Sequence, residues 1–187
     1  MTREEALDLY IPSGMEVAVH GYKHISLSEV EPAMAVCDVI SDRIELENLF
    51  GRVIKGMAYA NGAYNDLAIE LLKQTGISYS RTVTSTEAFE LPSDWLRLPA
   101  TCHHNSPRLM ELAKQFVENE GSQYYWGKKL QLFYLWGHSY EFDNDNNWEV
   151  IEKFAEYIGM QQMAKFSIIY KHVNSCNLVR TVVLFEI

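Results

Sequence analysis

The chain has 187 residues, of which 48% are hydrophobic, so it can bury one substantial core and we expect a single domain over residues 1–187. Its formal net charge of −9 disfavours non-specific binding to nucleic acid, because contacts to phosphates require clustered Lys and Arg. The longest apolar runs, such as residues 130–136, are far too short to span a membrane.

The N-terminal segment and the cysteines bear on the compartment. The first residues, MTREEALDLYIPSG, are acidic and helix-like, with neither the basic start nor the apolar centre of an export signal. We therefore expect a cytoplasmic chain. Three widely spaced cysteines, Cys37, Cys102 and Cys176, predict no disulfide framework and are compatible with a reducing compartment.

Helices alternate with short strands along the first part of the chain. Residues 2–10 are helix-like, and residues 16–19 predict a short strand after the turn Pro-Ser-Gly. An amphipathic pattern predicts a long helix over residues 28–50, which Gly51 ends. Residues 53–60 predict a second strand.

The middle of the chain repeats this order. A helix begins at a cap, either Asn65 or Asp66, and stops near Gly76. Residues 77–83 predict a third strand, and residues 84–99 are irregular.

The last part of the chain continues the alternation. Ser106 followed by Pro107 favours a helix start, since proline at the first helical position gives up only an unpaired N–H. Residues 130–136 predict a fourth, buried strand, and residues 143–159 predict caps, a helix and a glycine stop. Late strand candidates lie at residues 165–170 and 181–187. The repeated strand–helix pairs predict an α/β protein with a mostly parallel sheet, but they are too few for a complete barrel.

Polar side chains follow three of the predicted strands at the point where each ends. His20 and His24 follow the first strand, Asn61 and Gly62 the second, and His138 the fourth. Because sites in α/β proteins form at the carboxyl ends of strands, we expect a functional site there.

The His20 and His24 pair has two interpretations. Their four-residue spacing brings both rings to one side of a turn, where neutral imidazoles can bind a divalent metal. Two histidines do not close a metal site, so a carboxylate or a third nitrogen is needed. The other interpretation is a pair of surface or hydrogen-bonding histidines.

The remaining histidines are also open to two interpretations. His138 is suited to general acid or base catalysis, or it is a capping histidine beside Trp136 and Tyr140. His103 and His104 follow Cys102 in a segment that is either a polar loop or part of a site.

VAVHGYKH, residues 17–24, has an H-x-x-x-H pattern after a predicted strand, and it resembles a motif of the polysaccharide deacetylases, the NodB-like carbohydrate esterases. Two later segments also resemble motifs of this family. Residues 56–83, GMAYANGAYNDLAIELLKQTGISYSRTV, resemble the third motif with its glycine-containing loop and following helix. LFYLWGHSYEF, residues 132–142, resembles the last motif, an apolar strand leading to a histidine. The motifs occur in the order of the family.

The resemblance implies a distorted, TIM-like (β/α) barrel and the metal-dependent removal of acetyl groups from N-acetylated sugars. His20 and His24 would then be two metal ligands, usually for zinc, and His138 would protonate the leaving amine. The metal would polarise the amide carbonyl and lower the pKa of a bound water.

The resemblance also implies a substrate pocket. The main-chain N–H of Asn61 would help to hold the oxyanion. The residues assigned to the pocket are polar or aromatic and lie near strand ends or in loops: Tyr59, Asn61, Gly62, Trp95, His103 and His104.

Departures from the family pattern lower the expected activity. The first family motif is a strand ending in paired aspartates, the catalytic base and the third metal ligand, and this sequence has no Asp-Asp pair. The arginine of the third motif is replaced by Ala58. We therefore expect an N-terminally truncated, incomplete barrel that is weakly active or inactive. Its exposed sheet edges favour self-association, and a homo-oligomer that covers them is one hypothesis.

Two other functions stay open. One is a non-catalytic remnant of the fold that binds a carbohydrate or a partner. The other is a metal phosphoesterase in which Glu141 or Asp143 joins His20 and His24, although the sequence has no glycine-rich phosphate loop or basic cluster. Neither alternative predicts a nucleic-acid or membrane partner.

Overall fold

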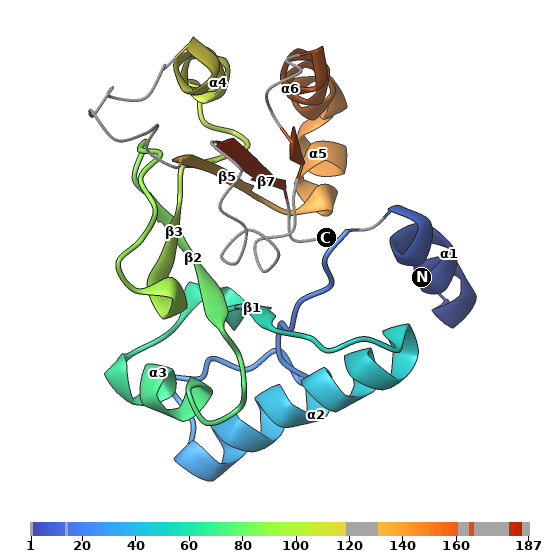
Figure 1. Cartoon of the computed structure of the whole chain (residues 1–187), viewed down its shortest axis with the longest axis vertical. Coiled ribbons are helices and arrows are strands. Elements are labelled where there is room, and N and C mark those ends of the chain that lie inside the picture. The colour runs from blue at the N-terminus through green and yellow to red at the C-terminus, as the bar shows by residue number, and fades with distance from the viewer. Residues whose placement is uncertain (1, 14, 119–130, 161–164, 167–179, 185–187) are drawn as a thin grey trace. The chain divides into compact units, whose positions relative to one another are not determined.

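The computed structural model divides into two compact units, each described below by itself. The first unit comprises residues 1–82 with 94–98, and the second comprises residues 83–93 with 99–187. The structure describes residues 2–13, 15–118, 131–160, 165–166 and 180–184 (Figure 1).

Helices and short strands alternate along the described chain. The helices are α1 (Arg3–Ser13), α2 (Pro32–Phe50), α3 (Asp66–Leu72), α4 (Leu109–Glu118), α5 (Ser139–Asp145) and α6 (Trp148–Met160), with short 3-10 helices η1 (Ala60–Gly62) and η2 (Trp95–Arg97). The strands are β1 (Gly56–Ala58), β2 (Tyr79–Ser85), β3 (Leu98–Ala100), β4 (Cys102–His103), β5 (Gln131–Trp136), β6 (Lys165–Phe166) and β7 (Arg180–Leu184).

The strands form two sheets, with the orders β1-β2-β3 and β4-β5-β7-β6. The pairs β1–β2, β4–β5, β5–β7 and β6–β7 are parallel. The prediction of an α/β protein with mostly parallel strands is confirmed. The described strands do not close into a barrel.

In the first unit, α2 shows the predicted helix signals. Pro32 occupies the first turn, where its missing N–H costs nothing. Gly51 ends the helix in the left-handed conformation (φ 62°), and its N–H donates to the carbonyl of Glu47. The predicted stop at Gly51 is confirmed, whereas the helix begins four residues later than residue 28. Ala35 and Val39, one turn apart, face the core.

The following elements are shorter than predicted. Asn65 is one of the two residues predicted to cap this helix. It caps α3, because its side-chain oxygen accepts a hydrogen bond from the N–H of Ala68 at 2.8 Å. The helix ends at Leu72, before Gly76. The strand predicted over residues 53–60 is reduced to β1.

The strand predicted over residues 16–19 is reduced to a single parallel bridge between Val19 and Met57. The N–H of Val19 donates to the carbonyl of Gly56, and the N–H of Ala58 donates to the carbonyl of Val19, both at 2.9 Å. Val19 is the one buried residue of this segment, so one residue pairs and the rest does not continue a sheet. The bridge nevertheless places His20 at the end of β1.

The second unit has a core between its helices and the β5 sheet. The buried residues of α4 recur every three or four positions, as in an amphipathic helix. Figure 1 shows α4 and α6 side by side over β5 and β7. Besides Phe89 and Cys102, the core residues come from α4, β5 and α6: Leu109, Leu112, Ala113, Phe116, Phe133, Leu135, Phe154 and Ile158. The predicted strand over residues 130–136 is confirmed as β5.

The helix predicted over residues 143–159 is split. Its first residues belong to α5, which Asn146 ends in the left-handed conformation (φ 48°). Gly159 lies inside α6 and does not stop it. Parts of the two late strands are seen as β6 and β7, and the rest of residues 165–170 and 181–187 lies outside the described residues.

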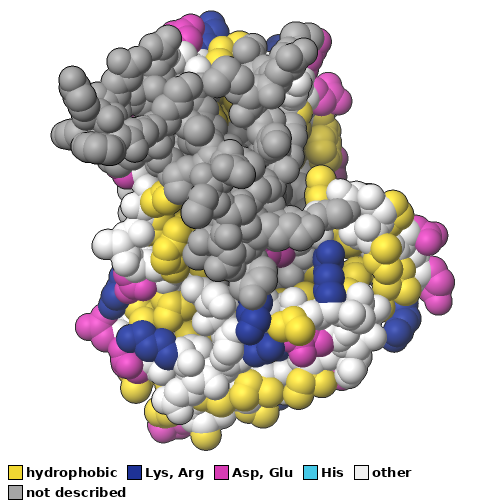
Figure 2. Space-filling view, viewed as in Figure 1, with side chains coloured by type: hydrophobic (Ala, Val, Ile, Leu, Met, Phe, Trp, Pro, Cys, Tyr) yellow, Lys and Arg dark blue, Asp and Glu magenta, His cyan; other side chains and the backbone are white. Residues whose placement is uncertain are grey.

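Two surface features complete the description. Hydrophobic side chains reach the surface along α2 (Figure 2), among them Ile40 and Ile44, which share one face.

Of the two described cysteines, Cys37 is exposed and Cys102 is buried, and both are free. Burial raises the pKa of the Cys102 thiol to about 12, and the negative charge of Glu87 adds to this effect. Within the described part of the chain, every helix is too short or too polar to cross a bilayer.

Candidate functional site

In the first unit, the segment from His20 to His24, the histidine loop, is held by acidic side chains of α2. The N–H groups of His20 and Gly21 both donate to Oδ2 of Asp42 at 2.9 Å. The N–H of Lys23 donates to Oδ1 of Asp38 at 2.8 Å. The helix therefore fixes the loop through its main chain.

The turn inside the histidine loop needs unusual backbone angles. Gly21 has φ +97°, and a Cβ at this position would lie 2.6 Å from Oδ2 of the buried Asp38. His24 has φ 53°, which non-glycine residues rarely adopt, and its N–H donates to the carbonyl of Gly21 at 3.2 Å. The glycine is thus required by both conformation and space.

The two imidazoles of the loop lie side by side. Their ring centroids are 4.7 Å apart, with the planes at 70°. The Nδ1–H of His20 donates to the carbonyl of Ala58 at 3.1 Å, an assignment that puts the lone pair of the neutral ring on Nε2. Metal-binding histidines commonly donate their second ring N–H to a carbonyl in this way. Among the described residues of the first unit, no third His, Cys, Asp or Glu joins the pair in a group of metal-ligand spacing.

The loop after β1 lies beside the histidine loop. Asn61 adopts the left-handed conformation (φ 57°), and its side-chain amide donates to Oγ of Ser26 at 3.2 Å. Gly62 also has a positive φ, and its N–H donates to the carbonyl of Tyr59. The structure therefore brings Asn61 to the segment that follows His24.

The two aromatic residues assigned to the pocket have different surroundings. Tyr59 is 2% exposed, its ring stacks on Tyr64, and its hydroxyl donates to the carbonyl of Leu96 at 2.8 Å. Burial raises the pKa of Tyr59 to about 12. Trp95 is half-buried and begins η2. Tyr59 belongs to the core of the first unit.

In the second unit, histidines gather at the carboxyl ends of two adjacent parallel strands. The register pairs Cys102 with Leu135 and His103 with Trp136. The N–H of His104 continues the ladder by donating to the carbonyl of Trp136 at 2.9 Å. Residues 103 and 104 therefore end one strand beside the end of β5, which leads through a glycine to His138.

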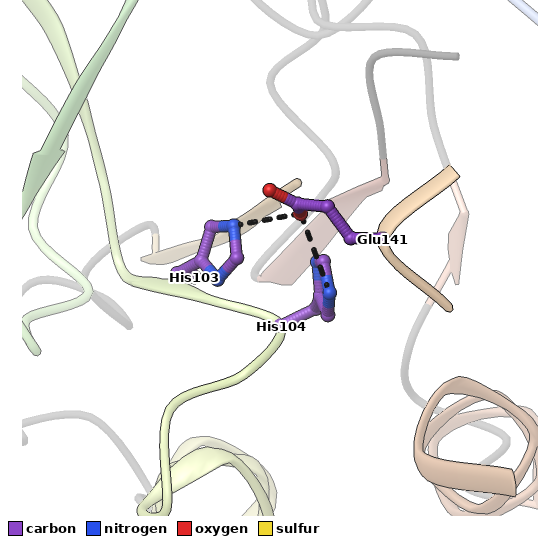
Figure 3. A group of neighbouring side chains, drawn as sticks. All are labelled: His103, His104 and Glu141. Atoms are coloured by element: carbon purple, nitrogen blue, oxygen red, sulfur yellow. Dashed lines mark ion pairs between the residues drawn. The ribbon is translucent and has the colours of Figure 1, made fainter. Parts of the chain in front are cut away.

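The carboxylate of Glu141 lies among three imidazoles, and these four residues are called the Glu141 cluster. Its Oε2 is 3.1 Å from Nε2 of His103 and 3.4 Å from Nε2 of His104, and both rings point toward it (Figure 3). Its Oε1 is 3.3 Å from Nδ1 of His138. Glu141 Oε2 also accepts the N–H of His138 at 3.1 Å. Burial alone would raise the pKa of Glu141, but the N–H and the ring of His138 outweigh it and lower this pKa.

His104 is enclosed on all sides. Its side chain is 0% exposed, and its ring packs on Phe142 with centroids 4.2 Å apart. Burial and the neighbouring His103 lower the pKa of His104, against the attraction of Glu141. The ring is therefore kept neutral in the folded chain near neutral pH.

His103 and His138 are only half-buried. Nδ1 of His103 accepts the N–H of Asn105 at 3.2 Å, and the ring meets Trp136 edge-on. His138 stacks on Tyr140 with centroids 5.1 Å apart, and it is the N-cap residue of α5. The interpretation of His138 as a capping residue predicted this position. The role of His138 in acid–base catalysis stays a proposal.

Two sets of contacts are not evident from the sequence. The phosphoesterase interpretation sets Glu141 beside His20 and His24, whereas the structure groups it with three other histidines of the second unit. Asp38 and Asp42, which hold the histidine loop, belong to none of the predicted sites. Their spacing of four residues on a helix that follows the histidine loop was the available signal, since it puts both carboxylates on one face.

Comparison with known proteins supports the resemblance over the N-terminal part. Residues 2–80 match the polysaccharide deacetylase family model. No curated protein matches the chain. Among solved structures, the Streptococcus pyogenes deacetylase PplD in complex with acetate is similar with a TM-score of 0.46 and 17% sequence identity, covering 53% of this chain. The chain covers 43% of that protein, less than half its length. Residues 2–80, which contain the histidine loop, are similar to the polysaccharide deacetylases, as the H-x-x-x-H motif predicted.

Proposed function

We propose that the chain is a metal-dependent hydrolase that removes acetyl groups from N-acetylated sugars. The observation that carries this proposal is the adjacent pair of imidazoles, His20 and His24, inside the stretch that matches the deacetylase family. The bond from His20 Nδ1 to the Ala58 carbonyl supports ligation through Nε2. A hydrolase acting on a carbon–nitrogen bond is the activity class that this similarity supports.

In this proposal His20 and His24 hold the metal, for which zinc suits a nitrogen-rich set. When bound, such a metal polarises the amide carbonyl and makes its water more acidic. The main-chain N–H of Asn61 is proposed to stabilise the oxyanion. Tyr59, Gly62 and the other assigned residues, Trp95, His103 and His104, stay proposed pocket residues.

His138 is proposed to give a proton to the leaving amine. The Glu141 carboxylate, 3.3 Å from Nδ1 of His138, would orient the ring and stabilise its protonated form. Since the sequence has no Asp-Asp pair to serve as base and third ligand, we expect turnover to be slow.

The test is acetate release from N-acetylated chitooligosaccharides, with and without added Zn²⁺. We expect slow, zinc-dependent release that falls at least about tenfold in His24→Gln, because a ligand is lost. Tyr22→Phe, an exposed change in the same loop, should leave the rate unchanged. An equal rate in His24→Gln, or no release above the protein-free blank, would contradict the proposal.

Several finer expectations stay predictions: the single domain over residues 1–187, the incomplete distorted barrel, the cytoplasmic location and the homo-oligomer. The phosphoesterase and the non-catalytic remnant gain no specific support from the described residues.

A further inference from the structure

The starting observation is a buried histidine whose two ring nitrogens lack a hydrogen-bond partner of normal geometry. His104 is 0% exposed, and neither of its ring nitrogens has a hydrogen-bond partner of normal geometry. Buried polar atoms in folded proteins are nearly always paired, so an unpaired imidazole calls for a specific reason. The ring is turned toward Glu141, whose Oε2 lies 3.4 Å from Nε2 (Figure 3).

The spacing of ligand atoms in His103, His104 and Glu141 suggests why the His104 ring is unpaired. One ring nitrogen of His103, one ring nitrogen of His104 and a carboxylate oxygen of Glu141 all lie within 4.8 Å of one another. The two nitrogen–oxygen distances are 3.1 and 3.4 Å. Ligands of a tetrahedral zinc ion with bonds of about 2.0–2.1 Å are roughly 3.3 Å apart, so both distances match ligand separations.

We infer that His103, His104 and Glu141 form a binding site for a divalent cation of the zinc type. Two imidazoles and one carboxylate are a known set for catalytic zinc, and they leave a fourth position for water or a ligand. The site shares His103 and His104 with the proposed pocket, and Glu141 is also proposed to orient His138. It uses neither His20 nor His24, which are proposed to hold the deacetylase metal, so a second metal site goes beyond the proposed function.

Binding requires one change at His103. Its Nδ1 accepts the N–H of Asn105, which puts the proton of the neutral ring on Nε2. Ligation through Nε2 moves that proton to Nδ1 and releases the Asn105 N–H. Asn105 is exposed, so water can accept this hydrogen bond. The ion takes the place of the direct contact between the His103 ring and the Glu141 carboxylate. The rings of His103 and His104 and the carboxylate of Glu141 are then its three ligands.

The test is the zinc content per chain, measured by plasma mass spectrometry after loading and desalting. The full chain carrying His20→Ala and His24→Ala is the background, because it removes the other candidate ligands. We expect this variant to retain about one zinc per chain. Adding Glu141→Gln should remove most of it, whereas the matched change Glu149→Gln, an exposed position on α6, should not.

Two further variants separate ligation from folding. Glu141→Gln keeps an amide oxygen that can accept the N–H of His138, so the start of α5 is preserved. His103→Gln alters a half-buried ring and should also lower the zinc content. Circular dichroism should show that both are folded.

The outcome is independent of acetate release. Loss of zinc in the His20→Ala/His24→Ala chain would overturn the inference, and so would full zinc retention in Glu141→Gln and His103→Gln. Failure of the deacetylase proposal would appear instead as missing acetate release in a chain that still binds zinc. Visible absorption of the cobalt-substituted chain should show the strong bands of a tetrahedral site in the background variant and lose them with Glu141→Gln.

Discussion

The imidazole of His104 lies against the main chain of Gly137. A Cβ at Gly137 would overlap Nδ1 of His104 and lie 2.6 Å from its Cε1. Gly137 also has φ +153°, which side chains rarely adopt. The glycine between β5 and His138 thus makes room for the histidine at the end of the neighbouring strand.

Gly137→Ala should lower the free energy of unfolding by about 1–3 kcal/mol, because the added methyl group is forced into a filled space. Urea denaturation measures the change. Gly159→Ala is the matched control, since nothing lies within 4 Å of its Cβ position inside α6. That variant should be equally or more stable, as alanine favours helices. Equal stability of the two variants would contradict the close packing of His104 and Gly137.

Asp42→Ala should loosen the histidine loop. It removes the acceptor of the His20 and Gly21 N–H groups, and an unsatisfied partly buried donor costs about 1–3 kcal/mol. We expect faster hydrogen exchange of these two amides, measured by NMR. Asp42→Asn keeps one acceptor oxygen and should have a smaller effect. Glu45→Ala, an exposed change on the same helix, should leave the exchange unchanged.

Glu47 should contribute stability that depends on pH. Its Oε1 accepts the N–H of Ile54 at 3.0 Å and the Nε–H of Arg43 at 2.8 Å, and these bonds lower its pKa below 4.5. A lowered folded pKa stabilises the fold above the unfolded value, and the contribution is lost as pH falls through the folded pKa. Between about pH 5 and 3, Glu47→Gln should therefore lose less unfolding free energy than the parent chain. The same slope in both proteins would refute this contribution.

The two described cysteines should differ in reactivity. In a Cys176→Ser background at pH 8, iodoacetamide should modify Cys37 in the folded chain and leave Cys102 unmodified. Cys102 is buried and its pKa is raised to about 12, so almost no thiolate forms. In urea both should react, because the unfolded pKa is near 9. Mass spectrometry counts the modified sites. Rapid modification of folded Cys102 would show that the residue opens to solvent.

Much of the local structure was predictable from sequence because its signals are local. Gly51 ends α2, Asn65 caps α3, and the apolar run before Gly137 forms β5. Each depends on residues a few positions apart, whose effects on the backbone are known. The predicted strand over residues 16–19 was too long because its pairing depends on a partner near Met57, which no local pattern reveals.

The Glu141 cluster could not be read from sequence for the same reason. His103 and Glu141 are brought together by the parallel pairing of β4 with β5, and only the register shows which residues meet. The sequence did place His138 at a strand end, since a buried run followed by glycine is a local signal. His103 and His104, at the end of a two-residue strand, gave no comparable pattern.

The way α2 holds the histidine loop has a consequence for how the loop can change. Asp38 and Asp42 accept hydrogen bonds from main-chain N–H groups, which are the same for almost every amino acid. The helix acts as a template that sets the shape of the loop and is indifferent to the side chains it displays. Apart from Gly21 and His24, whose positive φ few side chains adopt, the loop positions can therefore take most residues other than proline during evolution or redesign, and new ligands can be presented without a new backbone.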